Sequence, residues 1–236
     1  LISVGTRPYR PDSIPFDQTR IFDSDDILEI KSLPGIITVI GGGVVGVEYA
    51  TIFSALDVPV TLIEPRETIL EFVDRELVDD FIHQMRDRGM TIRLGCAVKD
   101  IAVKANGVEV TLADGRVVRS DILLYAAGRS GNVGSLGLDT VGIEADGRGK
   151  IKVDPVTFQT SVPNIYAAGD VIGFPSLAST SMEQGRVAAC HAFGMALPPP
   201  PETFPYGIYA GPGISTVGQS EEQVKASGVA YECGVA

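Results

Sequence analysis

The chain of 236 residues is long enough for one large domain or two ordinary ones, each with a substantial core. Its hydrophobic content of 44% and its 27 glycines are typical of an α/β protein and exclude a disordered or fibrous one. The formal net charge of -11 argues against a nucleic-acid or membrane partner, because binding to phosphates depends on Lys and Arg.

The cysteines and histidines indicate neither a metal site nor a disulfide framework. Cys96, Cys190 and Cys233 share no short spacing, and His83 and His191 are the only histidines. An odd, scattered set is typical of reduced thiols, so we expect a cytoplasmic protein. No apolar run approaches the roughly 18 to 20 residues of a membrane span, and no signal peptide is visible.

The chain opens on LISVG, a strand-like run, and continues through the proline-rich connector TRPYRPDSIPF. Ser24, followed by two aspartates, is expected to cap a short helix through Leu28. Residues 36–40 then predict a strand that ends in three glycines, and residues 44–56 predict the helix that follows. A second strand at residues 58–63 ends at Glu64.

An amphipathic helix is expected from Asp74 to Gly89, because Leu77, Phe81 and Met85 recur every four residues between charges. A third parallel strand follows at residues 90–94. The period then changes to two, and VEVTL, the turn ADG and RVVRS predict a hairpin. The run DILLYAAG returns to the parallel sheet. The predicted fold class is α/β, a Rossmann-like domain with an antiparallel hairpin or meander insertion.

The pattern restarts at Lys150 with strand, connector, strand and a helix at residues 177–193 that Gly194 ends. Prolines at residues 198–201 predict a rigid linker. An apolar run around residues 208–217 follows, and Ser220 with Gln223 predicts a capping box. Three strand ends resemble one another, namely ISVGTR, YAAGR and YAAGD. We interpret this as recurring chemistry at the carboxyl edge of a sheet, where ligands bind in open α/β folds.

The glycine-rich loop predicts a dinucleotide site. Gly41 permits a tight turn, Gly43 lets a pyrophosphate approach the backbone, and Gly46 lets the helix pack on the strand. The helix N-terminus then receives the phosphate charge. Glu64, at the end of the next strand, can accept hydrogen bonds from ribose hydroxyls and so favours NAD over NADP. Arg66 opposes this preference, because a guanidinium could pair with a 2′-phosphate.

Two further acids are open to two interpretations each. Glu48, inside the helix among apolar neighbours, is either solvated or held by a partner, and it could face the nicotinamide end of the cofactor. Asp170 ends a strand with no basic residue close in sequence. It either caps a helix or fixes the hydroxyls of a flavin, toward whose ring the helix from Leu177 would direct its positive end.

Together these segments resemble the two-dinucleotide flavoprotein family of lipoamide dehydrogenase and glutathione reductase. RIFDSDDIL, LLYAAGRSGNVGSL, GDVIGFPSLAS with EQGR, and PYGIYAGPGISTVG are similar to its soluble pyridine nucleotide transhydrogenase branch. The resemblance implies residues that contact the pyridine nucleotide, namely Gly41, Gly42, Gly43, Val44, Val45, Gly46, Glu48, Glu64, Arg66, Val98 and Gly128. It also implies residues that contact FAD, namely Gly5, Gly169, Asp170, Leu177 and Ala178.

The resemblance implies an FAD-dependent oxidoreductase, the Si-specific transhydrogenase, which moves hydride between NADH/NAD and NADPH/NADP in a ping-pong reaction. No side chain here is required as acid, base or nucleophile, and Glu48 alone is a candidate near the nicotinamide. One alternative is a dihydrolipoamide dehydrogenase-type disulfide oxidoreductase. Another, of a different class, is a non-catalytic nucleotide-binding module.

The same resemblance implies that the chain is a fragment, inactive by itself, of a homodimer or higher homo-oligomer. The family's first G-x-G-x-x-G and the region of its redox-active cysteine pair are not among these residues. The implied domains are the end of a first FAD-domain segment at 1–23, an NAD(P)-binding domain at 24–149, a second FAD-domain segment at 150–203 and the start of a dimer-interface domain at 204–236.

Overall fold

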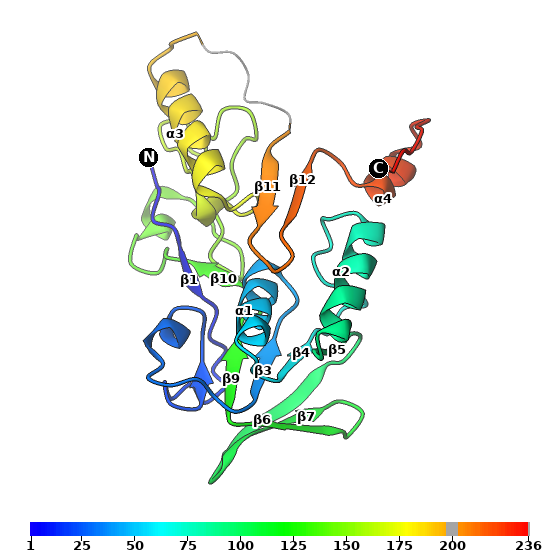
Figure 1. The fold of residues 1–236 in the computed structure, drawn as a ribbon. Helices are drawn as coiled ribbons and strands as arrows, with labels where there is room; N and C mark the ends of the chain where they lie inside the picture. The colour runs from blue at the N-terminus through cyan, green and yellow to red at the C-terminus, as the bar shows by residue number, and fades with distance from the viewer. Residues whose placement is uncertain (197–202, 236) are drawn as a thin grey trace. The chain divides into compact units, whose positions relative to one another are not determined.

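The computed structural model describes residues 1–196 and 203–235 (Figure 1). They divide into two compact units, one of residues Leu1–Tyr9 and Arg129–Tyr206, the other of Arg10–Gly128 and Gly207–Ala236. This division follows compactness and does not test the domain bounds implied above, which stay a prediction. The linker expected at residues 198–201 lies outside the described residues.

The larger unit is built on a parallel sheet of five strands in the order β2-β9-β3-β4-β5. The strands are β2 (Ile21–Phe22), β3 (Ile37–Ile40), β4 (Val60–Ile63), β5 (Thr91–Arg93) and β9 (Ile122–Tyr125). The central strand β3 is buried along its whole length, as expected for a parallel strand covered on both faces. It pairs with β4 on one side and with β9 on the other. The predicted Rossmann-like α/β fold, with its return strand, is confirmed.

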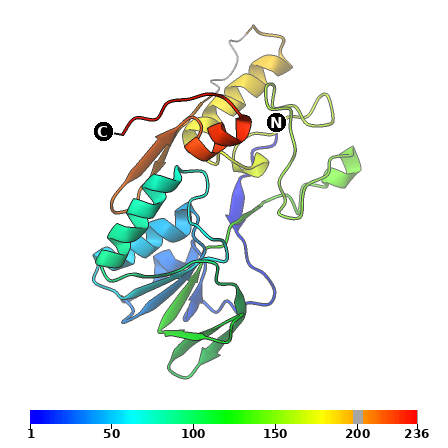
Figure 2. The same cartoon turned by 90° about the vertical axis from the view of Figure 1, so that its right-hand side faces the viewer.

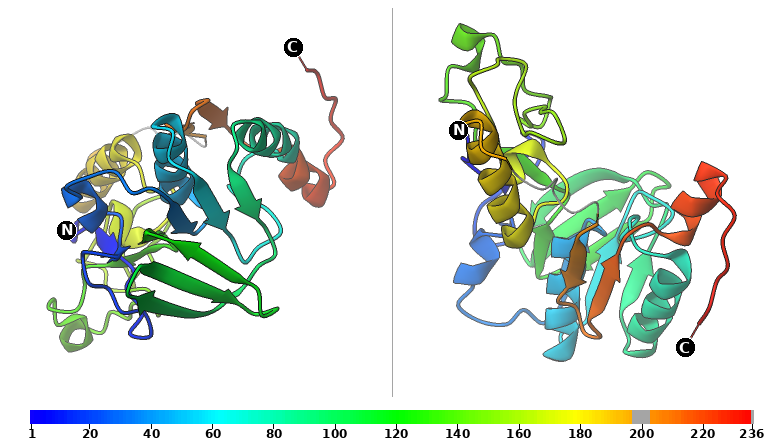
Figure 3. Two further views of the ribbon diagram at one scale, coloured as in Figure 1. Left: turned by 60° about the horizontal axis from the view of Figure 1, so that its bottom comes forward. Right: turned by 90° about the horizontal axis from the view of Figure 1, so that it is seen from above.

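Helices cover one face of this sheet and a second sheet covers the other (Figures 2 and 3). The helices are α1 (Val44–Ala55) and α2 (Arg75–Asp87). The second sheet contains β6 (Val98–Lys104), β7 (Gly107–Leu112) and β8 (Val117–Ser120), all antiparallel. The hairpin prediction is confirmed by β7 and β8, and β6 makes it a meander. Its apolar face shares one buried cluster with the parallel sheet.

Two local predictions in this unit are wrong. Leu77 is 49% exposed, whereas Val78, Phe81, Ile82 and Met85 form the buried face of α2. Residues four apart drift by about 40° around a helix, so an every-four row leaves the core face. Ser24 does not cap the short helix η1 (Asp26–Glu29). Instead, Oδ1 of Asp23 accepts hydrogen bonds from the backbone N–H groups of Asp25 and Asp26.

The smaller unit has little regular structure besides helix α3 (Ala178–Ala192). Its strands β1 (Thr6–Pro8) and β10 (Arg129–Gly131) pair antiparallel, and η2 (Leu138–Val141) and η3 (Asp170–Ile172) are short 3₁₀ helices. The strand expected at LISVG is thus an isolated bridge from Ile2 to Ala167, and β1 lies in the expected connector. The strands expected after Lys150 are also reduced to single bridges, from Ile151 to Ala145 and from Tyr166 to Gln159. Within the described chain, neither segment pairs with a neighbour over the several residues that make a strand.

The C-terminal segment contains β11 (Pro205–Ile208), β12 (Ile214–Val217) and α4 (Glu221–Ser227). The capping box is confirmed, since Ser220 and Gln223 each accept a hydrogen bond from the other's backbone N–H. Within the described part of the chain, no helix has the length and apolar character needed to cross a membrane.

Candidate functional site

The glycine loop joins β3 to α1, and its glycines meet different surroundings. Gly41 has φ 113°, and a Cβ there would lie 2.6 Å from the carbonyl oxygen of Ala126. A Cβ on Gly46 would lie 1.9 Å from the carbonyl oxygen of Gly41. A Cβ on Gly43 would meet nothing within 4 Å. Gly41 and Gly46 are therefore required by the fold itself, and Gly43 faces space that a ligand could use.

The N-terminus of α1 presents its first backbone N–H groups without a side-chain cap. Gly43 is the N-cap residue, and within the described chain no side chain caps it. Val44 and Val45 form the start of the helix. Uncapped amide groups together with the helix dipole favour an anion at this position. The loop and helix can therefore receive a phosphate group.

Glu64 lies directly behind this loop, at the end of β4, and only 3% of it is exposed. Its Oε2 accepts hydrogen bonds from the backbone N–H of Gly42 at 2.5 Å and from Nη2 of Arg66 at 3.0 Å. Its Oε1 accepts from the backbone N–H of Arg66 at 2.9 Å and from Nε of Arg66 at 2.8 Å. A carboxylate offers about four acceptor positions, so these bonds saturate it. A ribose hydroxyl can bind Glu64 only by displacing one of them.

Glu64 and Arg66 each stabilise the charged form of the other. Burial acts to raise the pKa of Glu64, but the hydrogen bonds from Arg66 and Gly42 outweigh it and hold the pKa below its usual range. The side-chain hydrogen bond between Arg66 and Glu64 also raises the pKa of Arg66. Arg66 also donates to Oε2 of Glu71 at 2.7 Å. This sequence therefore pairs its candidate ribose acceptor with its candidate phosphate-binding cation.

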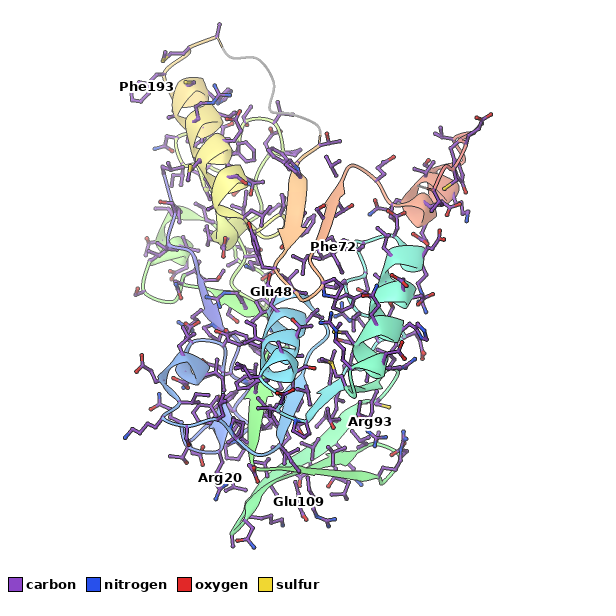
Figure 4. All side chains as sticks on the ribbon, in the orientation of Figure 1. Arg20, Glu48, Phe72, Arg93, Glu109 and Phe193 are labelled. Carbon is purple, nitrogen blue, oxygen red and sulfur yellow. The ribbon has the colours of Figure 1, made fainter. Side chains whose placement is uncertain are left out.

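The remaining candidates in the larger unit are spread over three elements. Glu48 lies on α1 (Figure 4). Its Oε1 accepts a hydrogen bond from the backbone N–H of Tyr209 at 2.8 Å, so Glu48 has a partner. Val98 begins β6 and packs against the buried apolar cluster. Gly128 follows β9 with φ 105°.

A second candidate site lies in the smaller unit, where a pocket of about 370 Å³ brings Gly5, Gly169 and Asp170 together. The pocket is also lined by Leu1, Ser3, Ala168, Ser181, Met182 and Gly185. Leu177 and Ala178 form the start of α3 and do not line it within the described chain. Oγ of Ser181 donates to the carbonyl oxygen of Leu177 at 2.8 Å, which links the pocket wall to the helix start.

Sequence reasoning missed the residues that hold Asp170. Oγ1 of Thr6 donates to Oδ2 of Asp170 at 3.2 Å, and Nζ of Lys150 donates to its backbone carbonyl oxygen at 2.7 Å. Oε1 of Gln184, which is buried, accepts from the backbone N–H of Gly169 at 2.7 Å. Asp170 is not the N-cap of α3, because Leu177 takes that position. The tertiary structure thus supplies the basic residue that the local sequence around Asp170 lacks.

The described residues contain no group of three or more His, Cys, Asp or Glu side chains that could hold a metal ion. Cys96, Cys190 and Cys233 are free thiols.

Comparison with known proteins gives a consistent result. A family model described as pyridine nucleotide-disulphide oxidoreductase matches residues 1–185. Proteins named soluble pyridine nucleotide transhydrogenase are 47% identical over 236 residues in Mycobacterium tuberculosis, 46% over 235 residues in Erwinia tasmaniensis and 43% over 234 residues in a Marinomonas species. Each alignment covers 99% or 100% of this chain and 50% of the relative. The chain thus spans about half the length of the curated relatives it matches.

Solved structures agree with the fold. LpdA from Mycobacterium tuberculosis is similar with a TM-score of 0.88 at 30% identity, over 97% of this chain and 50% of that one. RclA from Escherichia coli, described as an HOCl-induced flavoprotein disulfide reductase, is similar with a TM-score of 0.84 at 32% identity, over 95% of this chain and 52% of that one.

Proposed function

The chain belongs to the pyridine nucleotide-disulphide oxidoreductase family, and from that premise we propose that it is part of an FAD-dependent, Si-specific NAD(P)⁺ transhydrogenase. The observation that carries the proposal is the ion pair of Glu64 and Arg66 beside the Gly41 loop. One site must accept both NAD and NADP in such a reaction. Glu64 supplies the acceptor for a 2′-hydroxyl, and Arg66 supplies the cation for a 2′-phosphate.

The pyridine nucleotide is expected to lie on the loop and on the start of α1. Its pyrophosphate would bind the backbone near Gly43, where a Cβ would meet open space. Glu48 would lie toward the nicotinamide. Arg66 has to turn away from Glu64 or from Glu71 to reach a 2′-phosphate, so one of its two ion pairs has to open when NADP binds.

The smaller unit has features that fit part of an FAD site. Its pocket combines a carboxylate, Asp170, with the glycine backbones of Gly5 and Gly169, which suits a polyol chain. The start of α3, at Leu177 and Ala178, would direct its positive end toward the ring system. FAD supplies the two-electron chemistry when it is bound, and the protein's residues bind it, orient it and exclude water.

The experiment that tests the proposal measures hydride transfer by the natural protein that contains this sequence, purified from the organism that produces it. We expect oxidation of NADPH to be coupled to reduction of the thionicotinamide analogue of NAD. Reduction of lipoamide by NADH without that coupling would favour a disulfide reductase, the function that RclA's description names. Nucleotide binding without turnover in either assay would favour a binding module.

Identity to the named transhydrogenases, at 43% to 47%, exceeds identity to LpdA and RclA, at 30% to 32%, and so supports the first outcome. We further propose a cytoplasmic protein whose residues from 204 onward begin a dimer interface, so that it forms a homodimer or a higher homo-oligomer. Sedimentation equilibrium of the protein as made in its source tests this assembly, and a monomer would contradict it.

A further inference from the structure

Residues from three similar segments meet in the smaller unit. ISVGTR, YAAGR and YAAGD each place a polar residue after a glycine of positive φ. These pairs are Gly5-Thr6, Gly128-Arg129 and Gly169-Asp170. The three polar side chains form one hydrogen-bonded chain, in which Arg129 donates to Thr6 and Thr6 donates to Asp170.

The chemistry of the three groups sets the direction of these bonds. Nε of Arg129 donates to Oγ1 of Thr6 at 2.8 Å, and Nη2 of Arg129 donates to the backbone carbonyl oxygen of Thr6 at 3.0 Å. A guanidinium can only donate, and a hydroxyl carries a single proton. The proton of Thr6 is therefore directed to Oδ2 of Asp170, 3.2 Å away.

We propose that Thr6 is a positioning residue for FAD, acting through Asp170. A carboxyl group rotates easily about its last torsion angle, so a donor held by Arg129 fixes its plane. With Oδ2 bound to Thr6, Oδ1 is left to accept from a ligand hydroxyl in the pocket that Asp170 lines. This role rests on the FAD site of the proposed function.

The fold does not depend on the Thr6 hydroxyl. Strand β1 is held by backbone pairing, with Thr6 opposite Gly131 and Pro8 opposite Arg129. Valine keeps the branched shape that suits a strand and removes only the hydroxyl. Thr6→Val is therefore a probe of the hydrogen bond, and Thr6→Ser restores it. Thr157→Val is the matched control, because Oγ1 of Thr157 donates to an aspartate at 3.0 Å outside this pocket.

The test measures equilibrium binding of FAD to the flavin-free protein, as made in its source, by quenching of flavin fluorescence. We expect Thr6→Val to weaken FAD binding about tenfold, close to the lower end of the contribution of a hydrogen bond to a charged group. Thr6→Ser and Thr157→Val should remain within about twofold of the unsubstituted protein. The thermal unfolding midpoint of the flavin-free protein should not change in any of them.

A double-mutant cycle separates positioning from direct contact. In an Asp170→Asn background, Thr6→Val should cause no further loss of FAD binding. Three outcomes would contradict the positioning role of Thr6 and leave the proposed FAD site intact. They are an equal further loss of FAD binding when Thr6→Val is added to Asp170→Asn, unchanged FAD binding in Thr6→Val, and a lowered unfolding midpoint in Thr6→Val. An unsubstituted protein that binds no FAD removes the proposed FAD site together with this role.

Discussion

Glu64 serves two partners with one set of acceptor atoms. In the structure its carboxylate binds the glycine loop through Gly42 and the guanidinium of Arg66. A nucleotide ribose would compete with Arg66, while the bond to Gly42 can stay. We therefore expect the choice between NAD and NADP to depend on the balance between Glu64 and Arg66 in this ion pair.

We expect Glu64 to give NAD the advantage over NADP. Its charged hydrogen bonds to the ribose should contribute about 1.5–3 kcal/mol. Glu64→Ala should weaken NAD binding and narrow the gap to NADP, as measured by equilibrium titration with both nucleotides. Arg66→Ala is the matched control and should weaken NADP more than NAD. Equal binding of NAD and NADP by the unsubstituted protein would contradict the role of Glu64.

We expect Asp170 to contribute to the binding of the flavin and hardly at all to the stability of the fold. Asp170→Asn keeps the shape of the side chain and removes its charge, so flavin should be lost more readily on dilution. The unfolding midpoint of the flavin-free protein should hardly move, because Asn replaces Asp in local hydrogen bonds at little cost. Flavin content and thermal unfolding check this. Asp170 would instead have a structural role if the Asp170→Asn variant kept its full flavin content and the Asp170→Ala variant unfolded.

At the scale of elements, the junction of β3 and α1 separates what the fold needs from what the ligand needs. A Cβ on Gly46 would overlap the loop that precedes its own helix, whereas a Cβ on Gly43 would meet nothing within 4 Å. The two glycines belong to one motif, yet only one of them is required for packing. They therefore provide a matched pair of substitutions.

Gly43→Ala and Gly46→Ala should fail in different ways. Gly43→Ala should leave the unfolding midpoint nearly unchanged and weaken NAD binding, because the new methyl group occupies the space of the pyrophosphate. Gly46→Ala should lower the unfolding midpoint, because the methyl group would overlap the carbonyl oxygen of Gly41; overpacking typically costs about 1–3 kcal/mol. Thermal unfolding and NAD titration of both variants check this. Full NAD binding by Gly43→Ala would refute the proposed phosphate position.

At the scale of the whole molecule, buried acids link stability to pH. Burial acts to raise the pKa of Asp23, but hydrogen bonds from the backbone of Asp26 and the side chain of Arg10 outweigh it and lower the pKa. The pKa of Glu64 is lowered in the same way by Arg66 and Gly42. The unfolded chain therefore takes up protons more readily than the folded one in acid.

The free energy of unfolding should accordingly reach its maximum above about pH 5.5, roughly one pH unit above the ordinary pKa of a glutamate, where both groups are ionised even in the unfolded chain. It should fall as the pH drops through the lowered pKa values of the folded state. Urea unfolding at a series of pH values measures this. Asp23→Asn should flatten the acid limb of the curve, whereas Asp139→Asn, an exposed control, should not. Equal slopes in the two variants would show that Asp23 is not a source of the acid sensitivity.

The 236-residue chain should bind NAD(H) and hold FAD poorly. The loop, the start of α1 and Glu64 form one contiguous site within the larger unit, whereas the family's pyrophosphate loop for FAD is not among these residues. Titration of the purified chain should show NAD(H) binding in a preparation without flavin colour. Stoichiometric FAD, seen by its visible absorption, would contradict this.

Features that depend on neighbours along the chain could be predicted from the amino-acid sequence. The glycine loop, the β7–β8 hairpin and the capping box at Ser220 follow from turn and capping chemistry and from the period of 2 in the hairpin strands. The approximate ranges of α1, α2 and α3 follow from the glycines and capping residues at their ends and from the recurrence of apolar residues in α2. The side chains that surround Asp170 could not be predicted in this way, because they come from distant parts of the chain. Thr6 lies 164 residues from Asp170, and Arg129 lies 123 residues from Thr6, so no local pattern records their bonds. Short-range steric and hydrogen-bonding preferences leave a periodic signature in the sequence. Contacts between distant residues form only when folding brings together the segments that carry them, here β1, β10 and η3.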